Sequence, residues 1–442
     1  MFLPSTPRQR NRPVPVNGPV WRTAMRILFV SHAEKTHFFS MVPLAWALRT
    51  AGHEVRVATQ PEMAETVTRT GLTAVPLGSD HRWKQVMEAS QDAGWGDRVA
   101  EAVTRSADLG HDELFRFFDE TTSRYFRTVN NEEFADALVT YARGWRPDLI
   151  VWEQFTWAGA VAARVTGAAH ARMLWGADLV TRTRNDFLGH LAELPEDRRT
   201  DPLRDWLTES LARYGATYDE TVANGQWTID VNPPSHRIDN GLPVVGVRYI
   251  PYNGQAELPE WLATEPAKPR VAVTAGVSVR GYFGFDMFSV GALQAFAGLD
   301  IELVATLLPA PGESADMAPD NATVLDFVPM QGLLPTCSAV IHIGGAGVQS
   351  TAVHYGVPQL ILPGFWDTVV RADLLERSGA GLSLPPGQVT PESVRESLVR
   401  LLEDPSFRTG AEALRKDLLS APSPNEVVPV LEDLTARHQS AA

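Results

Sequence analysis

Cysteine is nearly absent from this chain of 442 residues, and the single Cys337 excludes both an intramolecular disulfide and a cysteine-rich metal site. Basic residues are also few: 39 Lys and Arg stand against 53 Asp and Glu, which gives a net charge of −14. That balance argues against a nucleic acid or an anionic membrane as the main partner. No apolar run approaches the roughly 20 residues of a membrane span. We therefore expect a cytoplasmic enzyme.

The start of the chain lacks the apolar core, about 7–15 residues long, that a signal peptide needs. Met1–Trp21 is instead rich in proline and arginine. We interpret residues 1–24 as a disordered leader. Met25 comes directly before the first apolar segment, so it is a candidate start codon.

The length of the chain favours two domains. A strand at Arg26–Val30, a helix at Phe39–Thr50 and a strand at His53–Ala58 open the first, which we assign to residues 25–231. Residues 232–268 are rich in proline and glycine and are typical of a linker. A second series of alternating strands and helices occupies residues 269–442. The predicted fold is α/β, with two facing, doubly wound, Rossmann-like domains and a cleft between them.

The most informative stretch is Val340–Asp367. An apolar strand leads into the glycine turn Gly344–Gly347, then into a helix that stops at Gly356, and then into a second strand at residues 359–362. Glycines at the start of a helix let the backbone approach a ligand, and the free N–H groups there favour an anion such as a phosphate. The alternative is a tight turn that only packs the helix on the sheet.

Two candidates for acid–base chemistry follow predicted strands of the first domain. In open parallel sheets, ligands lie beyond the carboxyl ends of the strands. His37 lies just past the first strand, and a neutral imidazole there would accept a proton near pH 7. A surface or capping role is the alternative for His37, and His32 in the same loop competes with it. Glu153 stands at the carboxyl end of the strand that begins after Trp145-Arg146-Pro147.

Residues 80–140 interrupt the alternation of strands and helices with aromatic residues at helical spacing. Such spacing indicates core or the lid of an apolar pocket. A large acceptor pocket or a partner-docking surface is the functional alternative. The aromatic residues are Trp83, Trp95, Phe115, Phe117, Phe118, Tyr125 and Phe126.

Taken together, these segments resemble the GT-B glycosyltransferases that use nucleotide sugars. Within that group the chain is similar to the actinobacterial antibiotic enzymes that transfer deoxyaminosugars from TDP to polyketides, of the desosaminyl, mycaminosyl, forosaminyl and rhodosaminyl type. The resemblance runs from about residue 25 to the C-terminus. It is carried by residues 36–58, 146–153, 170–176, 225–230, 252–254, 327–330 and 340–367.

The resemblance implies an inverting transfer of a deoxysugar or deoxyaminosugar from a TDP-sugar to a hydroxyl of a polyketide aglycone, either a macrolide or an anthracycline. His37 matches the position of the family's general base. Glu153 would orient or support that base, with pairing to a sugar amine or plain solvation as alternatives. No cofactor and no metal are expected, because the TDP-sugar is a co-substrate.

The same resemblance assigns the donor site to the second domain. Ser278 matches a turn that faces the diphosphate, and the backbone near Val328 matches the segment that reads the base. Trp366, Asp367 and Thr368 form the loop that meets the sugar, where Thr368 replaces a glutamine of many relatives and suits a sugar with fewer hydroxyls. The diphosphate cradle comprises His342, Gly344, Gly345, Ala346, Gly347 and Val348.

One departure from the family pattern stands out. Most relatives carry two consecutive histidines before the glycines, whereas this chain has His342 followed by Ile343, whose side chain donates no hydrogen bond. A non-catalytic or helper-dependent nucleotide-sugar-binding homologue is therefore one alternative function, and a nucleotide-sugar epimerase on the same fold is another. Some relatives act with a helper protein homologous to haem-thiolate monooxygenases, so we expect such a partner, with residues 80–140 as the place to look.

Overall fold

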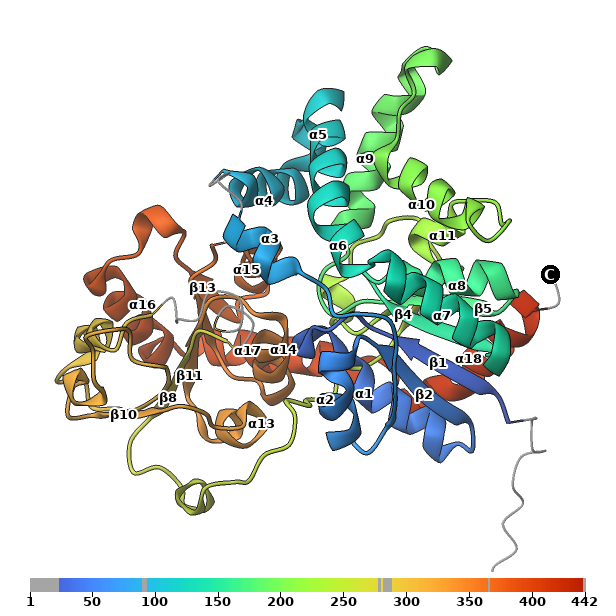
Figure 1. The fold of residues 1–442 in the computed structure, drawn as a ribbon. Helices are drawn as coiled ribbons and strands as arrows, with labels where there is room; N and C mark the ends of the chain where they lie inside the picture. Colours follow the sequence, from blue (N-terminus) through green and yellow to red (C-terminus); the bar gives the residue numbers. More distant parts are fainter. Residues whose placement is uncertain (1–23, 90–93, 277–279, 281–287, 365, 440–442) are drawn as a thin grey trace, which may run out of the picture.

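Two parallel sheets form the cores of two domains (Figure 1). The computed structural model describes residues 24–89, 94–276, 280, 288–364 and 366–439. Of the predicted leader only residue 24 is described, and Ser278 also lies outside the described residues. The predicted doubly wound α/β architecture is confirmed.

The first sheet has seven strands in the order β3-β2-β1-β4-β5-β6-β7, and its neighbouring strands pair in parallel. Its strands alternate between two buried faces. Leu28 and Val30 of β1 belong to one apolar cluster, while Ile27 and Phe29 belong to another. Burial on both faces explains the continuous apolar run in the sequence. The strands are β1 (Arg26–Val30), β2 (Glu54–Thr59), β3 (Thr73–Pro76), β4 (Leu149–Glu153), β5 (Ala169–Met173), β6 (Trp227–Asp230) and β7 (Val244–Gly246).

The second sheet has six strands in the order β10-β9-β8-β11-β12-β13, again paired in parallel. In both sheets the chain reverses its direction of travel next to the first strand, between β1 and β4 and between β8 and β11. These two points are where open α/β sheets bind ligands. The strands are β8 (Arg270–Thr274), β9 (Glu302–Thr306), β10 (Ala322–Leu325), β11 (Ala339–His342), β12 (Gln359–Ile361) and β13 (Gly381–Ser383).

Helix α1 (Lys35–Thr50) begins four residues before the predicted start at Phe39. The reason is a cap that the apolar pattern did not reveal: the Glu34 carboxylate accepts a hydrogen bond from the Thr36 backbone N–H at 3.2 Å. The sequence had suggested that His37 lies in a loop, but it lies in the first turn of this helix.

The aromatic segment 80–140 is helical, and its helices α3 to α6 lie in the upper half of Figure 1 while α7 lies lower. Its aromatic side chains point inward, since Trp83, Trp95, Phe118 and Tyr125 are all buried in one cluster. The core interpretation is thus confirmed for these side chains, and they do not form an exposed docking surface. The helices are α3 (Trp83–Ala89), α4 (Trp95–Arg105), α5 (His111–Thr121), the π-helix Thr122–Phe126, α6 (Arg127–Val129) and α7 (Glu132–Trp145).

The remaining helices cover the faces and ends of the two sheets. In the first domain they are α2 (Ala64–Arg69), α8 (Ala158–Thr166), α9 (Leu179–Glu193), α10 (Pro202–Ala212) and α11 (Thr221–Asn224). After β8 they are α13 (Met330–Leu333), α14 (Ala346–Tyr355), α15 (Thr368–Arg377), α16 (Pro391–Glu403), α17 (Pro405–Ser420) and α18 (Pro424–Gln439).

Two segments cross the predicted domain boundaries. Strand β7 lies inside the range 232–268 and pairs with β6, so the first sheet extends into the predicted linker. Helix α18, at the end of the second range, packs against α1 and β5 of the first domain (Figure 1). Both segments are short or amphipathic, and their partners are distant in sequence, which is why local composition did not place them.

None of the helices in the described part of the chain is both long and apolar enough to cross a lipid bilayer.

Candidate active site

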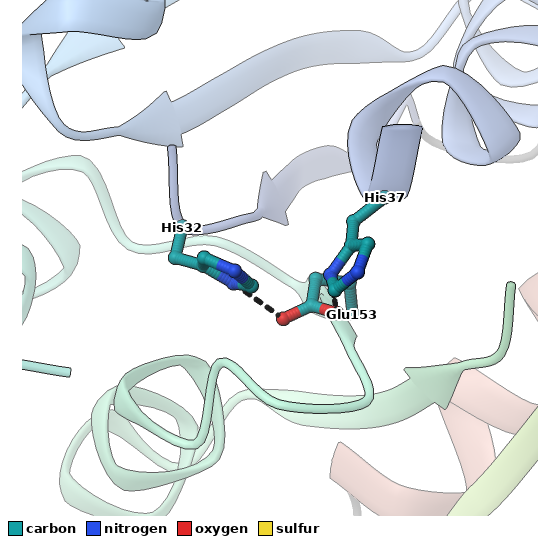
Figure 2. A group of neighbouring side chains, drawn as sticks. All are labelled: His32, His37 and Glu153. Atoms are coloured by element: carbon teal, nitrogen blue, oxygen red, sulfur yellow. Dashed lines mark hydrogen bonds and ion pairs between the residues drawn. The ribbon is translucent and has the colours of Figure 1, made fainter. Parts of the chain in front are cut away.

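The switch point of the first sheet brings three predicted or competing side chains together. Strands β1 and β4 are neighbours with Val30 opposite Trp152. His32 follows β1 and Glu153 ends β4, so both stand at the same edge of the sheet. Figure 2 shows the Glu153 carboxylate between the rings of His32 and His37.

Glu153 is completely buried, and hydrogen-bond donors surround both of its oxygens. Oε1 lies 2.9 Å from His32 Nδ1, accepts the Phe155 backbone N–H at 3.1 Å and accepts the Thr156 hydroxyl. Oε2 lies 3.1 Å from His37 Nδ1 and accepts the Trp175 indole N–H at 3.2 Å. Burial alone would raise the pKa of Glu153, but His32 and His37 outweigh it and hold that pKa well below its usual range. The side chain is therefore a carboxylate throughout the neutral range.

His37 is the partly exposed member of this group. Its ring stacks on Trp175 with centroids 4.4 Å apart, and its side chain is 13% exposed. Because a carboxylate only accepts hydrogen bonds, the Nδ1 atom that faces Glu153 carries the ring proton. The lone pair of a neutral His37 is then on Nε2, the atom on the other side of the ring. An imidazole held in this way can take a proton from an acceptor hydroxyl.

The structure separates the two competing histidines. His32 is completely buried, with Glu153 and Thr156 at its Nδ1 and Tyr125 at its Nε2. His37 has the exposed edge. Trp175, which orients His37 by both stacking and the shared carboxylate, was quoted in the sequence as part of a motif but given no role. Its position could have indicated a role at the site, because Trp175 follows two residues after β5, and β5 is a neighbour of β4.

Among the described residues, His32, His37 and Glu153 form a group in which one potential ligand atom of each lies within 4.8 Å of the others. The ring nitrogens that face Glu153 do so as hydrogen-bond donors, and the carboxylate already accepts from five groups. Hydrogen bonding thus accounts for the arrangement of these three side chains.

The glycine turn lies at the switch point of the second sheet, between β11 and α14. Gly344 has φ +89°, and a Cβ there would lie 2.9 Å from Thr368 Cβ, so the fold itself requires this glycine. A Cβ on Gly347 would have no neighbour within 4 Å, and one on Gly345 would only touch Val348 at 4.0 Å. The space above these two glycines, at the N-terminus of α14, is open to a ligand.

His342 lies beneath this turn and faces inward. It is completely buried, its Nε2 lies 2.9 Å from Gln359 Oε1, and its Nδ1 accepts the Gly344 N–H at 3.0 Å. Burial lowers the pKa of His342 to about 4, so the ring is neutral and supports the turn. The neighbouring Ile343 is 4% exposed, and its side chain is also turned into the protein.

The loop predicted to meet the sugar crosses to the first domain. The Trp366 ring packs edge-on against Phe155 with centroids 5.4 Å apart. Asp367 is buried, lies 3.4 Å from Arg371 Nη1, and sits so close to Gly176 that a Cβ there would be 2.7 Å from Asp367 Oδ2. Burial raises the pKa of Asp367 against the opposing effect of Arg371. The loop therefore brings the Asp367 carboxylate against Gly176, the residue that follows Trp175 in the first domain.

The other predicted donor residues have internal partners. Thr368 is buried, and its hydroxyl accepts the Gly364 N–H at 3.3 Å. The Val328 side chain is 1% exposed and packs in an apolar cluster, which leaves its backbone as the part able to meet a base. Arg371 had no predicted role, yet its guanidinium joins Asp367 to Gln349 of α14, with Nε 2.8 Å from Gln349 Oε1.

Comparison with known proteins agrees with this geometry. Residues 46–276 match the family model "Erythromycin biosynthesis protein CIII-like, N-terminal domain", and residues 291–434 match the corresponding C-terminal domain. The chain is 47% identical to the 10-deoxymethynolide desosaminyltransferase of Streptomyces venezuelae, over 94% of this chain and 98% of that protein. It is 48% identical to the aclacinomycin-T 2-deoxy-L-fucose transferase of Streptomyces galilaeus, over 94% and 97% of the two chains.

A solved structure, glycosyltransferase VinC in complex with dTDP, superposes with a TM-score of 0.84 at 36% identity, covering 93% of this chain and 100% of that one. The two domains and the facing switch points are those of a GT-B glycosyltransferase. The chain belongs to the erythromycin CIII-like family of glycosyltransferases. The resemblance inferred from the sequence is thereby confirmed.

Proposed function

We propose that this enzyme transfers a deoxysugar or deoxyaminosugar from a TDP-sugar to a hydroxyl of a polyketide aglycone, with inversion at the anomeric carbon. The observation that carries the proposal is the contact between His37 and Glu153 in the first domain, whose Nδ1 and Oε2 atoms lie 3.1 Å apart. It is found in a chain that belongs to this family of glycosyltransferases. The names of two relatives, a 10-deoxymethynolide desosaminyltransferase and an aclacinomycin-T 2-deoxy-L-fucose transferase, support this choice of donor and acceptor.

The chemistry assigned to the first domain is general base catalysis. His37 Nε2 takes the proton of the acceptor hydroxyl as its oxygen forms a bond to the anomeric carbon. The bond from that carbon to the phosphate oxygen breaks on the opposite face, and its electron pair leaves with TDP. Glu153 holds the Nδ1 proton in place and stabilises the imidazolium that forms. His37 and Glu153 are thus the catalytic pair, and neither a cofactor nor a metal enters the proposed mechanism.

The donor is assigned to the second domain. Backbone N–H groups at the start of α14, from Gly345 to Val348, would bind the diphosphate with the help of the helix dipole. His342 supports these groups from below, and the fold provides Ile343 as an apolar floor rather than a second donor. Asp367 would meet the sugar, while Ser278 and the backbone at Val328 would meet the phosphates and the base.

The acceptor is assigned to the aromatic side of the cleft. Phe155 makes edge-on contacts with both Trp175 and Trp366. Two of these rings lie beside His37: Trp175 stacks on it with centroids 4.4 Å apart, and the centroid of Phe155 is 5.9 Å away. An apolar polycyclic or macrocyclic aglycone would bury against such rings more favourably than a small polar acceptor.

The reaction is tested by supplying TDP-deoxyaminosugars with macrolide and anthracycline aglycones and following the products by mass spectrometry. A glycosylated aglycone formed only with both substrates supports transfer. An isomerised free nucleotide sugar would indicate the epimerase instead, and binding of TDP without turnover would indicate a non-catalytic protein.

The base is tested in the same assay with His37→Ala. We expect turnover to fall by at least about 100-fold, the usual contribution of a positioned base. The affinity for TDP, measured by calorimetry, should change little, because His37 lies in the other domain. Turnover like that of the wild type would remove His37 from the mechanism.

We also propose a helper protein and a cytoplasmic location. A helper homologous to haem-thiolate monooxygenases would meet the outer faces of helices α3 to α7, away from the buried side chains of Trp83, Trp95 and Phe118. The assay is therefore run with and without such a helper. It is also run with EDTA, and a loss of turnover that added metal restores would contradict the metal-free mechanism.

We place the enzyme in the cytoplasm, because nucleotide sugars are intracellular metabolites.

A further inference from the structure

His32 occupies a position that the proposed mechanism does not yet use. It follows β1, and its backbone N–H donates to Thr156 Oγ1 at 2.9 Å. Its side chain is completely buried, so it meets no substrate. A buried histidine that shares a carboxylate with the catalytic histidine requires a physical explanation, since a smaller apolar residue would fill the same space without needing hydrogen bonds.

The contacts of His32 fix its tautomer. Nδ1 lies 2.9 Å from Glu153 Oε1, and the carboxylate accepts only, so Nδ1 carries a proton. On the other side of the ring, the Tyr125 hydroxyl lies 3.4 Å from Nε2 and donates to it. Burial raises the pKa of Tyr125, which keeps this hydroxyl protonated. The tyrosine reaches His32 from the π-helix Thr122–Phe126, a rare element that often marks functional positions.

A linear network results from these contacts: the Tyr125 hydroxyl, the His32 ring, the Glu153 carboxylate and the His37 ring. His32 occupies Oε1 of the carboxylate and His37 occupies Oε2. The two rings also meet at right angles, with centroids 5.0 Å apart. Whatever His32 does to Glu153 is therefore transmitted to the hydrogen bond at His37.

We propose that His32 is a positioning residue of the transfer reaction: it holds Oε1 of Glu153 so that Oε2 orients His37, and it limits how tightly His37 binds a proton. This inference rests on the proposed role of His37 as the base. A base must also release its proton after each turnover, and a carboxylate bonded to His37 alone would retain that proton too strongly.

The direction of the effect does not depend on the charge of His32. As a neutral donor it draws electron density from the carboxylate, and as a cation it adds positive charge near His37. Loss of His32 strengthens proton binding at His37 in either case. Two other titratable groups lie around His32. Tyr125 stays neutral, and His81, whose ring centroid is 5.7 Å away, has its pKa lowered by burial to about 4. The negative charge of Glu34 raises the pKa of both groups at longer range.

The test compares two amides at position 32. In His32→Asn, the side-chain N–H₂ takes the place of Nδ1 and still donates to Glu153. In His32→Gln, the amide extends toward Tyr125 and leaves Oε1 without this donor. The acidic limb of the kcat/KM profile should move up by roughly one pH unit in His32→Gln, with a roughly tenfold loss of kcat, and His32→Asn should bring both back toward the wild type.

A matched control is His170→Gln, another buried histidine of the first sheet, which accepts the Trp152 indole N–H at 3.2 Å and has no contact with Glu153. It should alter thermal stability without moving the pH profile. Equal profiles for the wild type and a folded His32→Gln would overturn the proposal.

Histidine-labelled NMR gives a measurement that needs no substrate. The ring nitrogen shifts of the wild-type protein should show His32 protonated at Nδ1, and a His32 protonated only at Nε2 would overturn the proposal. Titration of His37 by the same method should move upward in His32→Gln. If no TDP-sugar is turned over yet His37 titrates as expected, the proposed function has failed while the coupling between the two histidines stands.

Discussion

At the scale of single residues, the pKa values of two buried carboxyl groups are shifted in opposite directions, according to the hydrogen-bond donors and charges around them. Glu153 is surrounded by hydrogen-bond donors, and its pKa is held low. Asp230, at the end of β6, has fewer partners: its Oδ1 accepts the Asn232 N–H and side-chain amide, both at 2.8 Å. Here burial dominates and raises the pKa of Asp230 to about 6.

Asp230→Asn tests that direction. Because the folded protein binds this proton more tightly than the unfolded chain, the stabilisation from the protonated form is complete below about pH 4 and is lost as the pH rises through 6. At pH 7.5 the ionised carboxylate costs up to about 3 kcal/mol, which the amide removes while its oxygen still accepts from Asn232. The Tm of the variant should exceed that of the wild type at pH 7.5 and match it near pH 4.

The control for this prediction is Asp373→Asn, an aspartate on α15 whose side chain is 50% exposed. Its Tm should follow that of the wild type at both pH values. The sign of the shift would be contradicted if the wild type gained Tm relative to Asp230→Asn as the pH rises from 4 to 7.5.

At the scale of elements, the glycine turn combines two requirements that the sequence presents as one motif. The fold requires Gly344, because its φ is positive and an added Cβ would collide with Thr368. His342 Nδ1 accepts the Gly344 N–H. Gly345 and Gly347 leave the start of α14 uncovered. The turn is thus a rigid support with an open upper side, which suits a diphosphate bound by backbone N–H groups.

Alanine substitutions should separate these two requirements. Gly347→Ala should leave the Tm near that of the wild type, because the added methyl group meets no atom, and should weaken TDP binding if the diphosphate occupies that space. Gly344→Ala should instead lower the free energy of unfolding by roughly 1–3 kcal/mol through backbone strain and the contact with Thr368. Thermal melts and calorimetry with TDP measure the two effects, and unchanged TDP affinity in Gly347→Ala would argue against the cradle.

At the scale of the whole molecule, the C-terminal helix α18 packs against the first domain, although it follows the second domain in the sequence. Leu431 and Val428 of this helix belong to the same apolar cluster as Phe38 and Leu48 of α1. His53 pairs with Glu432 at 3.2 Å, and the Gln439 amide donates to the Asp148 backbone oxygen at 3.0 Å. The last helix of the chain is therefore part of the core beneath the first sheet.

Leu431→Ala should lower the free energy of unfolding by about 2–5 kcal/mol, because the side chain is completely buried and leaves a cavity. Val430→Ala, at a neighbouring position that is 45% exposed, should change it by about 0.5 kcal/mol or less. Denaturant unfolding measures both. Similar small effects at the two positions would show that α18 does not contribute to the common core.

Much of this architecture was predictable from local sequence. Apolar runs placed β1, β4 and β11, and Gly356 marked the end of α14, because these signals depend on residues close in the chain. The start of α1 was misplaced since Glu34 caps it through a side chain, and β7 was missed since a three-residue strand has no periodicity of its own. The family itself was recognised from its motifs and confirmed by comparison.

The sequence by itself determined the doubly wound fold, the glycine turn and the choice of His37 and Glu153 as candidates, because strand ends and glycine spacing are local properties. Only the tertiary structure decided what those residues do for one another. It buried His32 and exposed His37, placed Trp175 beside them, and turned His342 under the cradle. The roles of His32 and His37 depend on contacts with Glu153, more than a hundred residues away, and such contacts exist only once the sheet has formed. His342 meets Gln359 of the neighbouring strand β12, a contact that likewise needs the second sheet.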